Sequence, residues 1–348
     1  MVFTSEQVSC GHPDKICDQI SDTIVTDCLR NDRNSRCGIE CLIKDRDILI
    51  SGELSSLHHP DLERLAFDVL HSVGIRDTSQ YWVTDWLGIQ SPDIAQGVDT
   101  GGAGDQGMMF GYATDETPEM LPIPFAVATL ALRLLRDLDS SMFLPDAKAQ
   151  VSFDYETGKI TTFLISTQHR SEYQVSDFCS IVETIMETAA EEYELNTDFR
   201  RLVNPTGRFV IGGSFADCGL TGRKIIADTY GGMCRHGGGA LSGKDPTKVD
   251  RSGAYMARKI AKDIVRAGDA KRCEVQLAYA IGVAEPVSVG VDCFGTEQRP
   301  VGEIVKAIRS SYDLTPRGII DRLHLLDVDY NDVAAYGHFG RCGLPWEE

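Results

Sequence analysis

Two glycine-rich segments in the C-terminal part of the sequence combine cations with carboxylates. Residues 217–224 and 237–251 together hold five lysines and arginines and three aspartates among small residues. Glycine lets backbone N–H groups approach anionic oxygens, cationic side chains neutralise those oxygens, and an aspartate can bind the Mg²⁺ that bridges them. This pattern predicts a polyphosphate site. Its candidate residues are Asp217, Arg223, Lys224, Lys244, Lys248 and Asp250.

The segment Gly11-His12-Pro13-Asp14-Lys15 predicts a second anion site near the N-terminus. Proline is favoured in the first turn of a helix, so a helix is expected to begin here. The N-terminus of a helix attracts anions, and His12 can donate to a phosphate oxygen at that point. Asp14 either binds Mg²⁺ beside the phosphates or only caps the helix, and the segment alone leaves both interpretations open.

Two glycine motifs imitate nucleotide-binding signatures but have the wrong surroundings. Residues 102–107 match G-x-G-x-x-G, yet no hydrophobic strand precedes them and no long helix follows, which argues against a dinucleotide-binding fold. Residues 238–244 nearly spell a P-loop, but Asp245 replaces the Ser or Thr that holds Mg²⁺. The second segment can still bind phosphate through its glycines and Lys244 without being a P-loop.

The positions of apolar residues predict the same order of elements three times. Each unit runs strand, helix, two strands, helix, strand, which is the split βαβ arrangement. Strands are expected at 2–8, 38–44, 47–54, 81–89, 107–113, 150–155, 159–166, 208–211, 224–230, 274–282 and 287–294, and helices at 13–30, 61–73, 124–138, 176–193, 250–267 and 301–312. The expected fold is α+β, with three structurally similar split-βαβ units in pseudo-threefold packing, divided as 1–99, 102–213 and 214–348.

Composition and charge exclude several classes of protein. The 348 residues carry a formal net charge of −18, which argues against a nucleic-acid partner. No run approaches the roughly 18 apolar residues needed to cross a bilayer, so no membrane partner is expected. The first residues show no secretory signal, and the expected location is therefore cytoplasmic. Eleven scattered cysteines without a CxxC pair favour free thiols over a structural zinc site.

Motifs distributed along the chain carry a family resemblance. They are 3–6, 11–15, 90–94, 102–113, 204–213, 219–224, 228–232, 237–240, 242–245, 248–251, 279–286 and 335–340. Together they resemble S-adenosylmethionine synthetase (methionine adenosyltransferase), and the match runs in order from residue 3 to residue 346. The hexapeptide around Asp105 and the glycine-rich segment near residue 237 are the parts most specific to that family.

The resemblance implies a displacement at carbon. The methionine sulfur would attack the ribose C5′ of ATP and expel tripolyphosphate, which the same site would hydrolyse to pyrophosphate and phosphate. Preorganised cations would stabilise the leaving group as its charge develops. The resemblance also implies a homo-oligomer, a dimer or a pair of dimers, with each active site at a subunit interface.

The resemblance also implies a role for each site residue. Phosphate contacts would come from His12, Lys148, Arg223, Lys224, Lys244 and Lys248, and methionine contacts from Glu53, Gln90, Asp105, Asp217 and Lys248. Arg208 and Phe209 would hold the adenosine, with Asp217 also at the ATP. Asp14 and Asp250 would bind two Mg²⁺ ions per site, and Glu40 would bind K⁺. The catalytic group would be His12, Lys148, Asp217, Arg223, Lys244 and Lys248.

Two of these residues have plain alternatives. Phe209 can instead be a core aromatic on a strand. Glu40 can be a solvated strand residue.

The sequence departs from the family pattern at three places. Thr100 and Gly101 shorten a segment, 96–104, that is a mobile active-site loop in the family, which predicts a less complete closure over the site. Cys10 stands where the family typically has Glu, and Leu144 stands where it usually has Arg.

Two other functions compete with this interpretation. A P-loop-like kinase or ATPase would release ADP and phosphate and leave the adenosine intact. A non-catalytic regulatory relative would have lost its site residues, whereas the cations and carboxylates named above are present.

Overall fold

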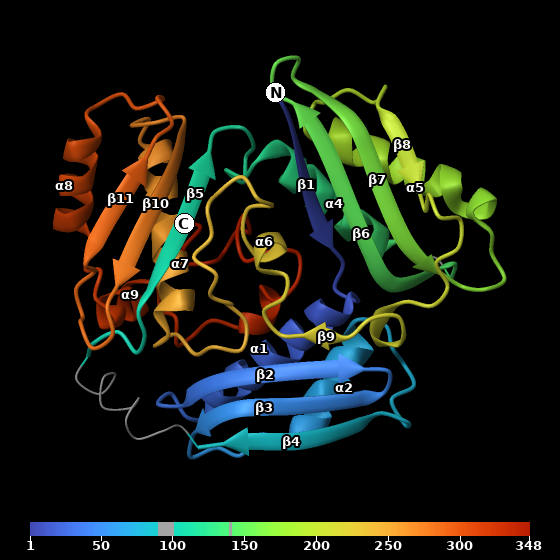
Figure 1. Cartoon of the computed structure of the whole chain (residues 1–348), viewed down its shortest axis with the longest axis horizontal. Helices are drawn as coiled ribbons and strands as arrows, with labels where there is room; N and C mark the ends of the chain where they lie inside the picture. The colour runs from blue at the N-terminus through green and yellow to red at the C-terminus, as the bar shows by residue number, and fades with distance from the viewer. Residues whose placement is uncertain (90–100, 139–140) are drawn as a thin grey trace.

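Three small β-sheets form the framework of the molecule (Figure 1). The computed structural model describes residues 1–89, 101–138 and 141–348. The first sheet has the order β1-β6-β7-β8, the second β11-β10-β5 and the third β4-β3-β2-β9. The strands are β1 (Val2–Val8), β2 (Arg36–Lys44), β3 (Asp47–Ser55), β4 (Trp82–Gly88), β5 (Gly107–Thr114), β6 (Phe143–Asp154), β7 (Lys159–His169), β8 (Arg200–Val203), β9 (Gly219–Leu220), β10 (Arg272–Tyr279) and β11 (Ser288–Asp292).

Each sheet takes one edge strand from another unit of the chain. β1 pairs antiparallel with β6, β5 pairs antiparallel with β10, and β9 pairs antiparallel with β2. In Figure 1 the dark blue β1 therefore lies beside the green β6, and the teal β5 beside the orange β10. The exchange is cyclic, because every unit gives one strand to the next, and it ties the three units into one body.

Helices cover one side of these sheets, and in Figure 1 most of them lie behind the strands. α1 and α2 pack on the third sheet, α4 and α5 on the first, and α7 and α8 on the second. The helices are α1 (Pro13–Asn31), α2 (Leu62–Ser72), α4 (Ile123–Asp137), α5 (Val175–Glu191), α6 (Ile225–Asp228), α7 (Val249–Arg266), α8 (Val301–Ser311) and α9 (Pro316–Arg322). The α+β class and the three similar units predicted from the sequence are confirmed, while the unit boundaries stay a prediction.

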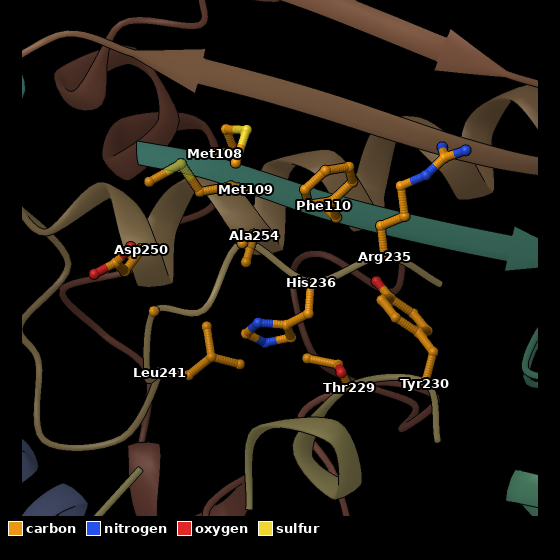
Figure 2. Close-up of a pocket in the computed structure, with 12 residues that line it drawn as sticks. Met108, Met109, Phe110, Thr229, Tyr230, Arg235, His236, Leu241, Asp250 and Ala254 are labelled. Atoms are coloured by element: carbon orange, nitrogen blue, oxygen red, sulfur yellow. The ribbon is translucent and has the colours of Figure 1, made fainter. Parts of the chain in front are cut away.

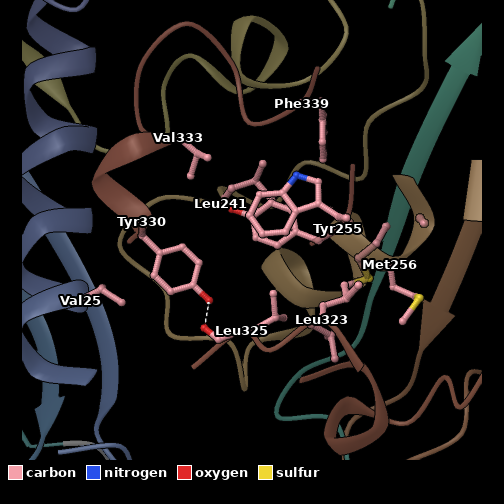
Figure 3. Close-up of a cluster of buried hydrophobic side chains, with 14 of the residues drawn as sticks. Val25, Leu241, Tyr255, Met256, Leu323, Leu325, Tyr330, Val333 and Phe339 are labelled. Atoms are coloured by element: carbon pink, nitrogen blue, oxygen red, sulfur yellow. Dashed lines mark hydrogen bonds between the residues drawn. The ribbon is translucent and has the colours of Figure 1, made fainter. Parts of the chain in front are cut away.

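One continuous core joins the first and last parts of the chain, and a second lies under α4 and α5. The C-terminal tail belongs to the first core, where the Trp346 ring stacks on Tyr255 with 3.8 Å between ring centroids. Figure 3 shows Tyr330 in the same core, donating its hydroxyl hydrogen to the carbonyl of Leu325 at 2.6 Å. The residues after α9 therefore help to hold α1 and α7 together.

The predicted strand at 208–211 is wrong. The strand is β8, which begins eight residues earlier, and it ends where Asn204 takes a positive φ of 40°. The Asn204 side chain then bonds both the N–H and the C=O of Thr167, so it occupies the place on β7 that a continuing strand would use.

The predicted strand at 224–230 is also wrong, because this segment contains the short helix α6. Its two isoleucines suggested a strand. The turn closes instead because Asp228 N donates to Lys224 O, and Gly231, at a φ of 60°, donates to Ile226 O.

Candidate active site

His12 begins the helix α1 and is almost fully buried, with 3% of its surface exposed. It is the N-cap residue, and its Nδ1 accepts a hydrogen bond from Asp14 N at 3.2 Å, with Pro13 in the first turn. His12 rather than Asp14 therefore caps the helix. Burial, followed by the positive charges of Lys224 and Lys148, lowers the pKa of His12 to about 3. A neutral ring that accepts at Nδ1 carries its proton on Nε2, which leaves one N–H donor.

Asp14 is held from two sides by the first glycine-rich segment. Its Oδ1 accepts from Leu220 N at 2.9 Å, and its Oδ2 forms an ion pair with the ammonium of Lys224. Asp14 is 2% exposed, whereas the Lys224 side chain keeps 23% of its surface open to solvent. Lys148 and Asp217 act electrostatically on His12, so both lie near this cluster. Side chains that are far apart in the sequence therefore meet at the start of α1.

Three aspartates on α1, four residues apart, fix both glycine-rich segments. Asp14, Asp18 and Asp22 accept from the backbone N–H groups of Leu220, Gly222 and Gly243, at 2.8–2.9 Å in each case. Residues four apart lie on one face of a helix, so these carboxylates form a column along α1. We call Asp14, Asp18 and Asp22 the carboxylate column.

Each member of the carboxylate column also has a cation. Lys224 pairs with Asp14, Lys15 with Asp18, and Arg251 with Asp22. The last two pairs are buried completely or nearly so. Asp228 joins this network through a second ion pair with Lys15.

Lys244 and Asp250 define a second cluster, at the edge of the third sheet. Their side chains form an ion pair, and the Lys244 backbone makes an isolated antiparallel bridge to Gly38 on β2. Gly38 stands opposite Glu53 in the β2–β3 ladder. Burial raises the pKa of Glu40, against the lowering effect of Lys244 and with a further rise from Asp18 and Glu53. Glu40, Glu53 and Lys244 therefore share one electrostatic neighbourhood.

Two glycines allow the second segment to come close. Gly243 has a φ of 83°, and a Cβ atom there would lie 2.1 Å from Ile39 O. A Cβ atom at Gly239 would lie 2.2 Å from Asp250 Oδ1. Both positions therefore need glycine for contact with β2 and with the carboxylate.

Asp245 explains why the near P-loop is not one. Its carboxylate accepts from Cys37 N at 2.7 Å and from Thr247 N at 2.9 Å, and it pairs with Lys248. Helix α7 begins only at Val249, and no strand leads into the glycines. The residue is a local anchor for the turn. The segment 102–107 is likewise followed by strand β5 rather than by a helix, as its flanks predicted.

A small cavity of about 20 Å³ adjoins Asp250 (Figure 2). The ring of His236 lies between Asp250 on one side and Tyr230 on the other. Burial lowers the pKa of His236, and Asp250 opposes that shift. Its Nδ1 accepts from Gly238 N at 2.8 Å, which orients the ring.

The other predicted site residues lie outside these clusters or are only loosely tied to them. Arg223 is exposed and donates weakly to Cys218 O at 3.4 Å, and Asp105 accepts from Gln106 N just before β5. Arg208 is exposed. Phe209 is half-buried and does not lie on a strand. It belongs to neither core, so it is not a core aromatic. Gln90 and most of the shortened loop lie outside the described residues.

The carboxylates of the site fit metal ions whose coordination is completed by a bound ligand. Within the described residues, no group of three or more His, Cys, Asp or Glu side chains could hold a metal ion. Asp14 and Asp250 each offer one carboxylate. Mg²⁺ is commonly bound in this way, by one or two carboxylates with substrate phosphates and water completing its shell.

Family models of S-adenosylmethionine synthetase match nearly the whole chain. The N-terminal domain model matches residues 1–92, the central domain model residues 100–209 and the C-terminal domain model residues 211–348. The chain belongs to the S-adenosylmethionine synthetase family. Its family makes S-adenosylmethionine from ATP and methionine, and is therefore a transferase family. In the described part of the chain, no helix is long and apolar enough to span a membrane.

Sequence reasoning missed several residues that hold the site together. Asp18, Asp22 and Asp228 are fully buried and bind the glycine-rich segments or Lys15. A signal was available, because aspartate recurs every four residues from Asp14. Asp146 was missed as well. It accepts from Gly213 N at 2.8 Å, and burial raises its pKa beside Lys148 and Asp217.

Proposed function

We propose that this chain is a methionine adenosyltransferase in which the methionine sulfur attacks the ribose C5′ of ATP and displaces tripolyphosphate. The observation that carries the proposal is the cluster at the start of α1, where neutral His12 lies beside Asp14, Lys224 and Lys148. A neutral imidazole with a free Nε2–H and nearby ammonium groups is suited to a chain of phosphates.

The chemistry needs charge stabilisation and positioning rather than a side-chain nucleophile. As the C5′–O bond breaks, negative charge grows on the leaving triphosphate, and fixed cations stabilise it without reorganising. Lys148, Lys224, Arg223, Lys244 and Lys248 would supply that charge. The carboxylate column holds the two segments that carry most of them, so the backbone that bears these side chains is fixed before the substrate binds.

Metal ions would add to this charge. Asp14 and Asp250 would hold Mg²⁺ against the triphosphate oxygens, and Glu40 would hold K⁺. When bound, these ions neutralise phosphate charge. Binding would require Lys224 and Lys244 to give up their ion pairs with the two aspartates and to turn toward phosphate.

The remaining residues are assigned to the two substrates. We propose that Phe209 stacks on the adenine and Arg208 contacts the nucleoside, since neither side chain is taken up in a core. Glu53, Asp105, Asp217, Gln90 and Lys248 would bind methionine, whose ammonium group calls for carboxylates. Asp217 would also contact ATP.

The second reaction follows from the same cations. Tripolyphosphate that stays bound after the transfer would be hydrolysed to pyrophosphate and phosphate. No further site is required, because the donors that stabilise the leaving group also stabilise the charge of phosphoryl transfer to water.

A homodimer, alone or as half of a tetramer, would complete each site. Large apolar side chains on the strands support a subunit interface, since Trp82 and Trp86 on β4 are 72% and 67% exposed and Met108 on β5 is 49% exposed. We propose that the His12 cluster of one subunit faces the Lys244 cluster of the other. A cytoplasmic location fits both substrates.

Product analysis tests the proposal. The purified protein is incubated with ATP, methionine, Mg²⁺ and K⁺, and the products are separated by mass spectrometry. S-adenosylmethionine with pyrophosphate and phosphate is expected. ADP as the nucleotide product would favour a kinase or ATPase, and no turnover would favour a non-catalytic relative.

A further inference from the structure

A cavity of about 600 Å³ lies beside α4 and the start of β6 and contains none of the site residues named above. The end of α2 and the residues after it form one wall, and α4 with the start of β6 forms the other. A volume of this size falls within the roughly 300–1,000 Å³ typical of small-molecule sites. It is too small for a folded partner.

The cavity lining is cationic and apolar, with no carboxylate among its described residues. Arg76, Arg136 and Arg170 contribute three guanidinium groups. Leucines, a proline and aromatic rings contribute the apolar part, including Leu135, Phe143 and Leu144. The whole chain has 52 acidic and 34 basic residues. A lining with three arginines and no carboxylate therefore differs in charge from the chain as a whole.

The three guanidinium groups are available to a ligand. In the part of the chain that the structure describes, no carboxylate lies within ion-pair distance of any of them. Arg136 Nη2 donates to Ser72 O, and Arg170 Nε donates to Ser141 O at 2.7 Å. These bonds orient two of the groups. Guanidinium has five N–H donors, and its fork matches carboxylate, sulfonate and phosphate oxygens.

We propose that this cavity binds a small organic anion with an apolar body. The arginines would receive the charged end, and the leucine and aromatic wall would receive the body. Removal of that apolar surface from water would stabilise the bound state.

The floor of the cavity leads directly to the active-site cluster. Ser9 lines it, and its Oγ donates to Pro145 O at 2.6 Å and accepts from Ala147 N at 2.8 Å. His12 N donates to Ser9 O at 3.1 Å, and Lys148 follows Ala147. A bound anion would therefore touch the junction from which both residues extend, which makes this a site of regulation rather than catalysis.

The test uses two fluorescent probes that share one ring system. 1-Anilinonaphthalene-8-sulfonate carries a sulfonate, and N-phenyl-1-naphthylamine lacks it. Both are titrated into the full-length protein with a non-hydrolysable ATP analogue present, so that the proposed nucleotide site is filled. Fluorescence reports binding without turnover, so the result does not depend on the proposed reaction.

Two variants target the cavity, and each has a matched control. Arg136→Gln/Arg170→Gln removes two guanidinium groups, and Leu138→Glu places a carboxylate at a position that is 37% exposed. Arg64→Gln/Arg317→Gln, on α2 and α9, and Leu57→Glu, at a position 91% exposed, make the same changes elsewhere. Circular dichroism confirms that each variant is folded.

The sulfonate probe is expected to bind the wild-type protein, and both cavity variants should weaken it by about tenfold or more, the effect of losing roughly 1.4 kcal/mol. The controls should stay within about twofold of wild type, and the uncharged probe should bind all variants alike. Equal affinity of the sulfonate probe for wild type and Arg136→Gln/Arg170→Gln would overturn the proposal. So would equal binding of the charged and uncharged probes to the wild type.

Discussion

The imidazole of His12 uses its two nitrogen atoms for different tasks. Nδ1 accepts from Asp14 N and so completes the cap of α1. Nε2 carries the proton, because burial and two neighbouring lysines keep the ring neutral. The structure of the helix start and the proposed phosphate contact therefore depend on opposite sides of one ring, and a substitution can separate them.

His12→Asn should keep the cap and lose the donor at the position of Nε2, because the amide N–H groups of asparagine lie closer to the backbone. Asparagine is a good N-cap residue, so the fold and the melting temperature should change little. Loss of one preorganised donor should lower kcat by about 10²–10³. Steady-state kinetics and calorimetry measure the two effects. His58→Asn is the matched control, since His58 pairs with Asp27 on the surface. Turnover of His12→Asn close to wild type would remove His12 from the chemistry.

Residue types in the glycine-rich segments were enough to name Lys224, Lys244 and Asp250 as candidates for a polyphosphate site, and in the structure all three take part in ion pairs. They were not enough to name the partners. Asp14 lies 210 positions from Lys224. The two residues meet because α1 packs against the C-terminal part of the chain. No local sequence pattern indicates this packing.

At the scale of elements, α1 has two buried faces, one apolar and one formed by carboxylates. Ile16, Ile20 and Ile24 pack into the core, as their spacing predicted, while the carboxylate column faces the glycine-rich segments. The spacing of the isoleucines predicted the helix and its apolar face. It did not predict that the aspartate face is buried as well. Polar residues usually mark the solvent side of a helix, and here they are paired and buried instead.

Asp22→Asn should destabilise the protein by removing half of a buried ion pair. The pair with Arg251 is fully buried, and an uncompensated guanidinium in that place costs about 3–5 kcal/mol. Urea unfolding measures the change. Asp321→Asn breaks the exposed pair with Arg317 and should cost at most about 1 kcal/mol. A loss at Asp22 no larger than at Asp321 would contradict the role given to the carboxylate column.

Asp18 should make stability depend on pH. Burial, opposed by Lys15 and reinforced by Asp228, raises the pKa of Asp18 from 3.8 to about 7. Between about pH 4 and pH 7 the native state then holds a proton that the unfolded chain has released, and the ion pair between Lys15 and Asp18 forms as this proton leaves. This contribution to stability is complete below about pH 4 and is lost as the pH rises to about 7.

Asp18→Asn removes this titration while keeping the side-chain shape. The melting temperature of the wild type should fall more between pH 5 and pH 8 than that of Asp18→Asn. Calorimetry at both pH values measures the difference. The groups that face Asp18 are Lys15, Asp228 and the N–H of Gly222, with Glu40 nearby, and the variant leaves all of them in place. Parallel pH profiles would show that Asp18 is ionised in the native state.

At the scale of the whole molecule, the order of elements was predictable and the pairing of strands was not. Residues 2–8 were predicted as a strand, but nothing in those residues indicates that its partner is β6. The cyclic exchange of β1, β5 and β9 is a property of the assembled units. β9 in turn carries Leu220 to Asp14, so the exchange that links the units also builds the site.

Two inactive variants should restore activity to each other if each site is shared between subunits. His12→Asn damages one cluster and Lys244→Ala the other. Unfolded together in equal amounts and refolded, half of the dimers would be mixed, and each mixed dimer would keep one intact site of two. Activity should then return to about a quarter of wild type. Native mass spectrometry verifies the mixed dimers, and their complete inactivity would place both clusters in a site within one chain.

The central claim is that the reaction breaks the bond between C5′ and oxygen rather than a phosphorus–oxygen bond. ATP carrying ¹⁸O in the bridge between C5′ and the α-phosphorus tests it directly, with methionine, Mg²⁺ and K⁺ present. Attack at carbon leaves the label on the expelled tripolyphosphate, so all of it should appear in pyrophosphate and phosphate. The nucleoside of S-adenosylmethionine contains no oxygen at C5′. Label that stays attached to C5′ in a nucleotide or nucleoside product would show attack at phosphorus and contradict this account.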